Sequence, residues 1–256
     1  MFGHRIYRYM KLNLLIKIIL VFLGVLYIAL QAFQMEIEGS GISTLILVFL
    51  TILYWQFSKI RKKSFLLFLI LFTSAQLIGF LSWFLPLQVI EVFDFPYYLA
   101  NTIFILSYIC LIQHILNGVG PAKLIKRYPG PAIILLLLDV FCVYIVTETA
   151  GTVFTAPEYI LEFVYNGVIM LLLSVALLNY LYKDSGKAML FLIGTIFIVF
   201  SEIIQLAYFY VLESNDLSAT YATFLVMAFL FFYLQSQLHP AKHFSELQDE
   251  NFTISQ

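Results

Sequence analysis

Eight long apolar segments follow one another along almost the whole chain of 256 residues. About 20 consecutive apolar residues are enough for a helix to cross a bilayer. Transmembrane strands would instead need segments of about ten residues with alternating polarity, which these segments do not have. We therefore predict an all-α polytopic membrane protein with eight transmembrane helices. The predicted spans cover residues 12–33, 42–57, 64–85, 95–116, 131–148, 157–182, 186–212 and 217–238.

The composition leaves little room for a separate water-soluble domain. Hydrophobic residues make up 62% of the chain and charged residues 11%, whereas soluble domains are about 25% charged. We expect one transmembrane domain over residues 1–238 and a short polar cytoplasmic tail over 239–256. The segment from Leu12 to Phe33 is too long for the apolar region of a signal peptide, so we expect it to be the first span. The net charge of −1 and the lack of a basic patch argue against a nucleic-acid partner.

The basic residues indicate an orientation in the membrane. With eight crossings, all fourteen Lys and Arg residues fall on one side, and cytoplasmic loops are the ones enriched in Lys and Arg. We therefore predict both termini in the cytoplasm, in the inner (cytoplasmic) cell membrane. The connections on the other side contain no Lys or Arg. Their charged residues are all acidic: Glu36, Glu38, Glu91, Asp94, Glu148, Glu158, Glu213 and Asp216.

A two-fold internal repeat is a further hypothesis. In residues 12–116, Gln76 lies 13 residues after Lys63, and in residues 131–238, Glu202 lies 15 residues after Lys187. Each half thus places a polar side chain at a similar depth of its third helix. Halves of four helices each would be parallel repeats, related by an axis along the membrane normal.

Polar side chains inside the apolar segments are the candidate functional residues. Gln76, Asp139 and Glu202 lie near mid-depth, where an ionisable group costs at least about 2.5 kcal/mol. Polar side chains face the interior of a bundle, so we expect these three to line one cavity with neighbouring polar groups. The groups expected to bind substrate there are Glu162, Asn166, Gln205, Ser201, Tyr108 and Gln235.

The chemistry of two buried acids leaves several hypotheses open. No Lys or Arg lies in the middle of the apolar segments that carry Glu202 and Asp139. Burial without a positive partner favours the protonated form of each carboxyl. Two carboxyls in one cavity could divide the roles of acid and base, relay protons or bind a cation, or simply donate structural hydrogen bonds. Cys110 and Cys142 lie in apolar segments, and no His/Cys/Asp/Glu cluster has metal-ligand spacing. We predict no metal and no cofactor.

The stretch from Gly194 to Glu202 carries a resemblance to a known family. Eight helices with short connections resemble the YhhN family, which includes lysoplasmalogenases, and whose late helix has the pattern G-x-x-x-F-x-x-S-D. Here Gly194, Phe197, Ser201 and Glu202 are similar in length and position, with Glu in place of Asp. The Tyr and Gln residues of 233–237 are similar to the end of the family's next helix.

Two other family positions differ in this chain. Ala75-Gln76 stands where the family has a Gly-Asp pair, and Ser107-Tyr108 stands where it has Ala-His. The resemblance therefore suggests a divergent member. It implies hydrolysis of the vinyl ether bond of a lysophospholipid, a single-chain amphiphile that would enter from the lipid. Glu202 would then be the acid, and Asp139 or Glu162 the base, because Gln76 cannot take up a proton.

Two other functions fit the same residues. A proton-coupled transporter would use Glu202 and Asp139 as coupling acids and the two halves as its repeats. A membrane sensor that binds a partner would keep the acids for structure.

Overall fold

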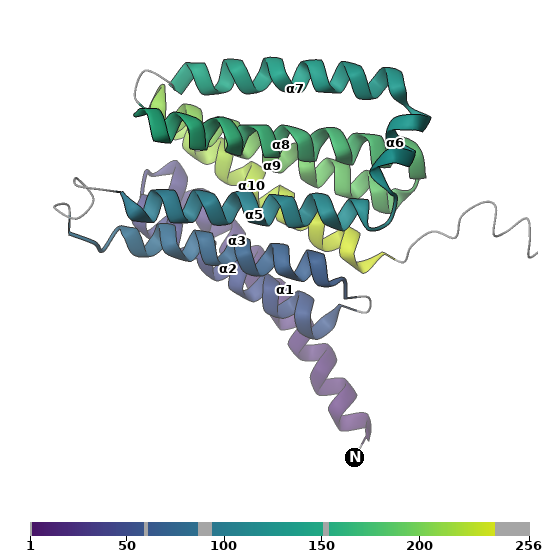
Figure 1. The fold of residues 1–256 in the computed structure, drawn as a ribbon. Helices are drawn as coiled ribbons and strands as arrows, with labels where there is room; N and C mark the ends of the chain where they lie inside the picture. The colour runs from purple at the N-terminus through teal and green to yellow at the C-terminus, as the bar shows by residue number, and fades with distance from the viewer. Residues whose placement is uncertain (1, 59–60, 87–93, 151–153, 239–256) are drawn as a thin grey trace, which may run out of the picture.

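The computed structural model describes residues 2–58, 61–86, 94–150 and 154–238 (Figure 1). Every regular element within these ranges is a helix. The helices are α1 (Phe2–Ala32), α2 (Glu36–Phe57), α3 (Lys63–Ser82), α5 (Phe95–Leu116), α6 (Pro121–Arg127), α7 (Pro129–Ala150), α8 (Ala156–Lys183), α9 (Gly186–Tyr210) and α10 (Asn215–Gln237). All except the short α6 are long and apolar enough to cross a membrane, which gives eight candidate spans. The predicted all-α polytopic fold is confirmed.

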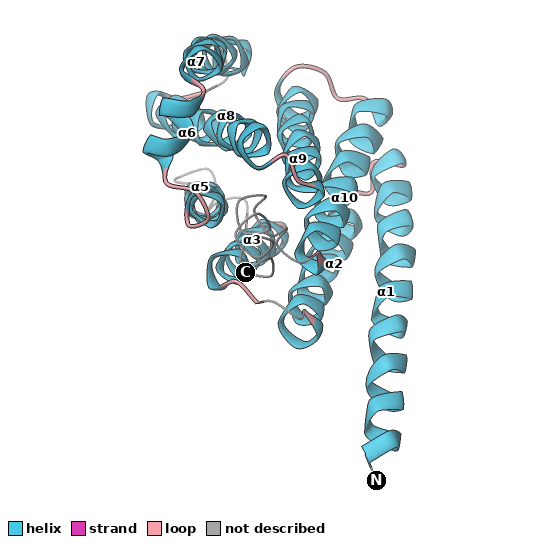
Figure 2. Ribbon diagram, turned by 90° about the vertical axis from the view of Figure 1, so that its right-hand side faces the viewer, coloured by secondary structure: helices cyan, strands magenta, loops and turns pink. Residues whose placement is uncertain are grey.

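Seven of the long helices form a closed ring. Neighbours in the chain pack against one another from α1 through α2 and α3 to α5, and again from α8 through α9 to α10. The ring closes where α5 packs on α8 and α1 packs on α10. Figure 2 shows this arrangement and places α7 outside the ring, against α8. The position of α7 decides which polar groups can meet, as described below.

The outer position of α7 matches its side chains. Large apolar residues cover it on several sides, and Leu137, Val140 and Phe141 are each at least 60% exposed. Such exposure would be unfavourable in water but suits a helix in contact with lipid chains. Because α7 packs mainly on α8, most of its remaining surface is suited to contact with lipid.

Aromatic side chains fill the half of the bundle interior that lies near the N-terminal end of α3. Phe65, Phe68 and Phe72 of α3 pack in edge-on and stacked pairs against Phe229 and Phe232 of α10. Phe68 and Phe232 are completely buried. Aromatic pairs of this kind contribute beyond the area that they bury, so this part of the bundle is closely packed.

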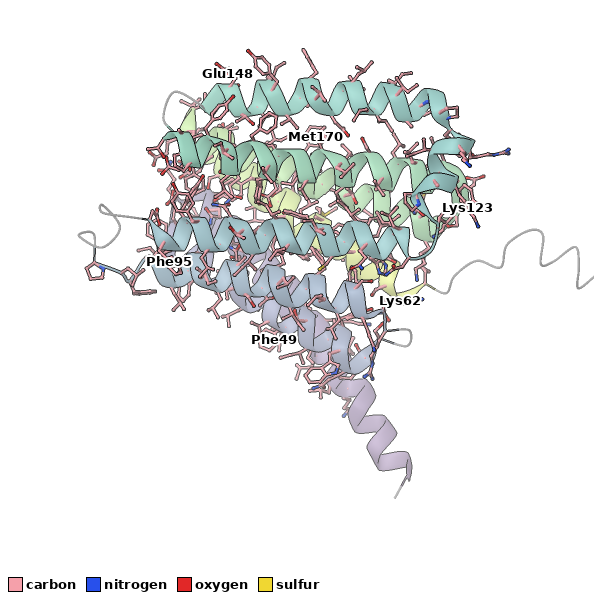
Figure 3. All side chains as sticks on the ribbon, in the orientation of Figure 1. Phe49, Lys62, Phe95, Lys123, Glu148 and Met170 are labelled. Atoms are coloured by element: carbon pink, nitrogen blue, oxygen red, sulfur yellow. The ribbon has the colours of Figure 1, made fainter. Side chains whose placement is uncertain are left out.

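The two ends of the bundle differ in charge. Lys62 and Lys123 lie at one end and Glu148 lies at the other (Figure 3). We call them the basic end and the acidic end. Helices α3 and α9 begin at the basic end, and α5 and α8 end there. The acidic end includes Glu36 and Glu213. This separation is the one expected from the sequence; which side of the membrane each end faces remains a prediction.

The connection predicted at Gly39-Ser-Gly41 is wrong. Helix α2 begins at Glu36 and includes both glycines, so the connection from α1 occupies only residues 33–35. A Cβ on Gly39 would lie 2.5 Å from Nε2 of Gln31. Small residues allow membrane helices to approach closely, so Gly39 serves helix packing here rather than a turn.

The repeat hypothesis remains a prediction. Consecutive helices pack in the same order within residues 12–116 and within 131–238. The outer members of the two halves differ, because α1 packs on α10 to close the ring while α7 packs mainly on α8. The tail at 239–256 lies outside the described residues.

Candidate functional site

Glu202 lies in the interior of the ring, with its carboxyl bonded to two tyrosines. The hydroxyl of Tyr108 on α5 donates to Oε1, and the hydroxyl of Tyr165 on α8 donates to Oε2 at 2.8 Å. Both tyrosines are buried. Both oxygens of the acid therefore have a donor, which offsets much of the cost of holding a carboxyl inside the bundle.

Packing fixes the two tyrosines in this position. Their rings meet edge to face, with centroids 5.9 Å apart. Tyr108 also packs edge-on against Phe72, and Tyr165 against Phe104. Because α5, α8 and α9 are neighbours in the ring, three side chains from separate helices converge on one carboxyl. Surrounding aromatic rings limit the rotamers available to both hydroxyls, so the Glu202 carboxyl is held in a defined orientation.

A second carboxyl lies close to this group. Glu162 is buried and accepts a hydrogen bond of 2.9 Å from the hydroxyl of Tyr97 on α5. It precedes Tyr165 by three residues on α8, so the two share a helix face. Glu162 also interacts electrostatically with Glu202. We call Glu162, Glu202, Tyr97, Tyr108 and Tyr165 the Glu/Tyr cluster.

Asp139 belongs to a different interface. Its carboxyl accepts bonds of 2.9 and 2.7 Å from the Ser174 hydroxyl, between α7 and α8. Ser174 follows Tyr165 by nine residues, about two and a half helical turns, and therefore lies on the opposite face of α8. The structure thus separates Asp139 from Glu202, because α7 lies outside the ring.

The other predicted site residues join pairs of helices. Asn166 donates to Thr147 of α7 at 3.3 Å, and Gln76 donates to Ser43 of α2 at 2.8 Å. The Ser201 hydroxyl donates to the carbonyl of Tyr221 on α10 at 2.8 Å. The single cavity expected for all these groups is therefore wrong: their hydrogen bonds lie at several helix interfaces.

Two glutamines complete the set of predicted residues. Gln205 follows Glu202 by less than one turn of α9 and is partly buried. Gln235 is buried near the basic end of α10. Tyr108 and Glu162, by contrast, are predicted substrate-binding residues that do lie in the Glu/Tyr cluster.

Tyr97 and Tyr165 are the members of the cluster that sequence reasoning missed. Tyrosine is enriched at membrane–water interfaces, where its hydroxyl needs no protein partner. The available signal was a tyrosine within an apolar segment that also carries an acid, as Tyr165 does three residues after Glu162. Helical spacing shows that these two share a face, but it does not identify the helix that this face contacts.

A pocket at the acidic end lies on the side of the cluster toward the membrane surface. It has a volume of about 390 Å³ and is lined by residues 208–213 of α9 and its connection, together with Glu36. Tyr210, in this wall, interacts electrostatically with Glu162. The hydroxyl of Tyr208 donates to Glu36 at 2.6 Å. Polar and acidic groups thus extend from this pocket to Glu162.

A second, apolar groove opens between α1, α2 and α10. Its volume is about 240 Å³, and its walls include Leu20, Gly24, Leu47 and Phe229. Tyr27 also lines the groove and interacts electrostatically with Glu202. Val21 and Val25, also in its wall, are each more than 60% exposed, so the groove opens to the lipid-facing surface.

Within the described ranges, no group of three or more His, Cys, Asp or Glu residues could hold a metal ion.

Comparisons of the chain with protein-family models, curated proteins and solved structures found no match.

Proposed function

We propose that this integral membrane protein is a hydrolase of YhhN-like fold that cleaves the vinyl ether bond of a lysophospholipid. One observation carries the proposal: the Glu202 carboxyl is held by two tyrosine hydroxyls inside the helix ring and interacts electrostatically with the Glu162 carboxyl. The resemblance of residues 194–202 to the family's Ser-Asp segment supports it. Glu162 takes the role of second carboxyl, which the sequence left open between Asp139 and Glu162.

The reaction needs one neutral acid and one base. In the acid form of Glu202, one tyrosine hydroxyl accepts from the carboxyl instead of donating to it. Protonated Glu202 then donates its proton to the vinyl carbon that does not bear the ether oxygen, which leaves an oxocarbenium ion. Water then adds to that ion as Glu162 accepts a proton from it. The hemiacetal that results separates into a fatty aldehyde and the free glycerol hydroxyl as its O–H proton moves to the ether oxygen. The proton taken up by Glu162 returns to Glu202, which restores both carboxyls. Environments that keep two nearby carboxyls in different protonation states are typical of such acid–base pairs.

The two cavities suit the two ends of a single-chain amphiphile. The apolar groove beside Tyr27 would accept the hydrocarbon chain. The pocket at the acidic end, with Glu36 and Glu213 in its wall, would accept a headgroup that carries an ammonium group. The bond to be cleaved lies between chain and headgroup, and the proposal requires it to reach the Glu/Tyr cluster, whose residues line neither of these two cavities.

The test is release of fatty aldehyde from lysoplasmalogen by the purified protein. Glu202→Gln keeps the size of the side chain but cannot donate a proton as an acid, so we expect activity to fall at least about 100-fold. Asp139→Asn is the matched control. It changes another intramembrane acid, which lies on α7 against the opposite face of α8, and the activity of this variant should stay within about threefold of wild type. Equal losses in the two variants, or no aldehyde release by folded wild type, would contradict the proposal.

One observation favours a second candidate, a proton-coupled carrier. The Glu/Tyr cluster is connected toward the acidic end through Tyr210, whereas phenylalanines pack the half of the ring toward the basic end. Acids that are reached from one side at a time are what alternating access requires. Proton uptake by proteoliposomes, abolished in Glu202→Gln, in a protein without aldehyde release would select the carrier.

A further inference from the structure

Three lysines gather at the basic end of the bundle, two of them on either side of the α8–α9 connection. Lys62 immediately precedes α3, Lys183 ends α8 and Lys187 lies in the first turn of α9. Each of the three interacts electrostatically with the imidazole of His114, near the end of α5. We call Lys62, Lys183 and Lys187 the lysine cluster.

Local packing holds two of these side chains in place. Nζ of Lys187 donates a hydrogen bond of 2.8 Å to the carbonyl of Leu238. Nζ of Lys183 lies only 2.8 Å from the point that a Cβ on Gly118 would occupy. A side chain at position 118 would therefore displace the ammonium group, and the glycine leaves room for it.

His114 forms the floor between the lysines and the aromatic core. Its ring stacks on Phe191, with centroids 6.1 Å apart, and its Nδ1 lies 3.2 Å from the hydroxyl of Ser64. These contacts fix the imidazole on the bundle side. The lysine ammonium groups consequently lie between the imidazole and the water or headgroup layer at the basic end.

The charges in this cluster reinforce rather than balance one another. Although Asp184 follows Lys183 in the chain, the charged group that acts on Lys183 is Lys62. The groups that act on Lys187 are Lys62 and Lys183. Like charges at close range repel one another. An anion placed among the three would convert this repulsion into attraction.

The helix ends add to the positive potential. Both α3 and α9 begin here, and a helix N-terminus carries the equivalent of about half a positive charge. Backbone N–H groups at such ends are suited to bind phosphate. The N-cap position of α3 is Lys62 itself, without a side-chain hydrogen bond to the helix, so the first turn of α3 lacks the cap that a Ser or Asp would provide.

We propose that the lysine cluster binds a phosphate group, carried either by an anionic lipid headgroup or by a soluble phosphate. The site lies at the basic end and does not depend on the proposed hydrolysis at Glu202. Lys183 and Lys187 flank the α8–α9 connection, and folding brings Lys62 and His114 to them, which distinguishes the site from the general enrichment of basic residues on one side of a membrane protein.

The first experiment uses purified full-length protein in a zwitterionic detergent. Thermal unfolding is followed with added inorganic phosphate and with chloride at equal ionic strength, since a ligand of the folded state raises its melting temperature. We expect phosphate, but not chloride, to raise the Tm by several degrees in wild type. The variant Lys183→Gln/Lys187→Gln should lose most of this shift.

The control variant removes two charges from the same end. Lys123 and Lys126 are exposed on α6, and Lys123→Gln/Lys126→Gln should keep the wild-type shift. If Lys183→Gln/Lys187→Gln does not fold, Lys62→Gln provides the same test, because the Lys62 side chain is exposed and precedes the helix. Equal shifts in the cluster and control variants, or equal effects of phosphate and chloride on wild type, would overturn the proposal unless the lipid experiment gives a specific result.

The second experiment identifies the source of the phosphate. Nanodiscs are prepared with equal amounts of phosphatidylglycerol and phosphatidylcholine, and the lipids retained by the protein are measured by native mass spectrometry. Selective retention of phosphatidylglycerol that depends on the lysine cluster assigns the site to a headgroup. A response to inorganic phosphate without such retention assigns it to a soluble phosphate. If neither the phosphate response nor the lipid retention is found, the site is refuted.

The acidic residues of the tail provide the last control. Glu246, Asp249 and Glu250 belong to the tail at 239–256, which follows α10 in the sequence. The full-length variant Glu246→Gln/Asp249→Asn/Glu250→Gln should show the same phosphate shift as wild type. A phosphate response that appears only in this variant would mean that the protein's own tail neutralises the lysines, which would overturn the proposal.

Discussion

Gly194 allows a quantitative test of how closely α9 and α10 pack. A Cβ at this position would lie 2.8 Å from Cδ1 and 2.9 Å from Cε1 of Phe232, and 3.3 Å from the carbonyl oxygen of Ala228. Ordinary van der Waals contacts are longer than any of these distances. The perturbation Gly194→Ala therefore forces either the Phe232 ring or the α10 backbone to move.

The surroundings of Phe232 make that movement costly. The ring is completely buried and packs against Phe65, Phe68 and Phe191. Overpacking of a well-packed core costs about 1–3 kcal/mol, whereas Gly to Ala within a helix gains up to about 1 kcal/mol. We expect Gly194→Ala to lower the free energy of unfolding by about 1–2 kcal/mol.

Gly167 provides the matched control. It lies within α8, and a Cβ there would meet no neighbouring atom within 4 Å. Gly167→Ala should leave the stability unchanged or raise it by up to about 1 kcal/mol. The assay is reversible unfolding in mixed micelles with increasing denaturing detergent, followed by near-UV circular dichroism. Gly194→Ala as stable as Gly167→Ala would refute the close approach of α9 and α10 at this point.

Two further predictions concern α7 and the orientation. Ser174→Ala removes the donor to the partly buried Asp139 carboxyl and should lower the free energy of unfolding by about 1–2 kcal/mol. Aldehyde release per folded molecule should stay at the wild-type rate. Lost activity at unchanged stability would place Asp139 in the chemistry after all. For the orientation, a cysteine at Glu38 should react with an impermeant maleimide on intact cells, and a cysteine at Lys126 only after permeabilisation. The reverse pattern of labelling would show that the acidic end faces the cytoplasm.

Helix length and charge distribution could be predicted because both follow from the bilayer. The span predicted at 131–148 corresponds to candidate span Pro129–Thr149, and the one at 95–116 has the bounds of α5. The start of α2 was missed by six residues, since glycines usually mark connections. Here Gly39 fits against Gln31 of α1, and Gly41 fits against Phe80 of α3. A glycine that permits close helix packing and one that permits a turn look the same in a sequence.

The candidate site was predicted in part. Glu202 stood out because an acid in an apolar segment is costly, and Glu162 and Tyr108 were also selected. Tyr165 and Tyr97 were missed, although they supply hydrogen bonds to the two carboxyls. A hydroxyl donor can come from any helix at the right depth, and one sequence does not show which helices are neighbours.

Depth and helix neighbours are determined by different physics, and this explains the outcome for Asp139. The distance of a residue from the end of an apolar segment sets its depth. The order of residues is therefore enough to place Asp139 and Glu202 within apolar spans, and to give the eight spans and the charge difference between the ends. The position of α7 outside the ring follows from helix packing, because it depends on how the side chains of α5, α8 and α9 fit together. Asp139 consequently meets Ser174 on the outer face of α8, while Glu202 meets Tyr165 on its inner face.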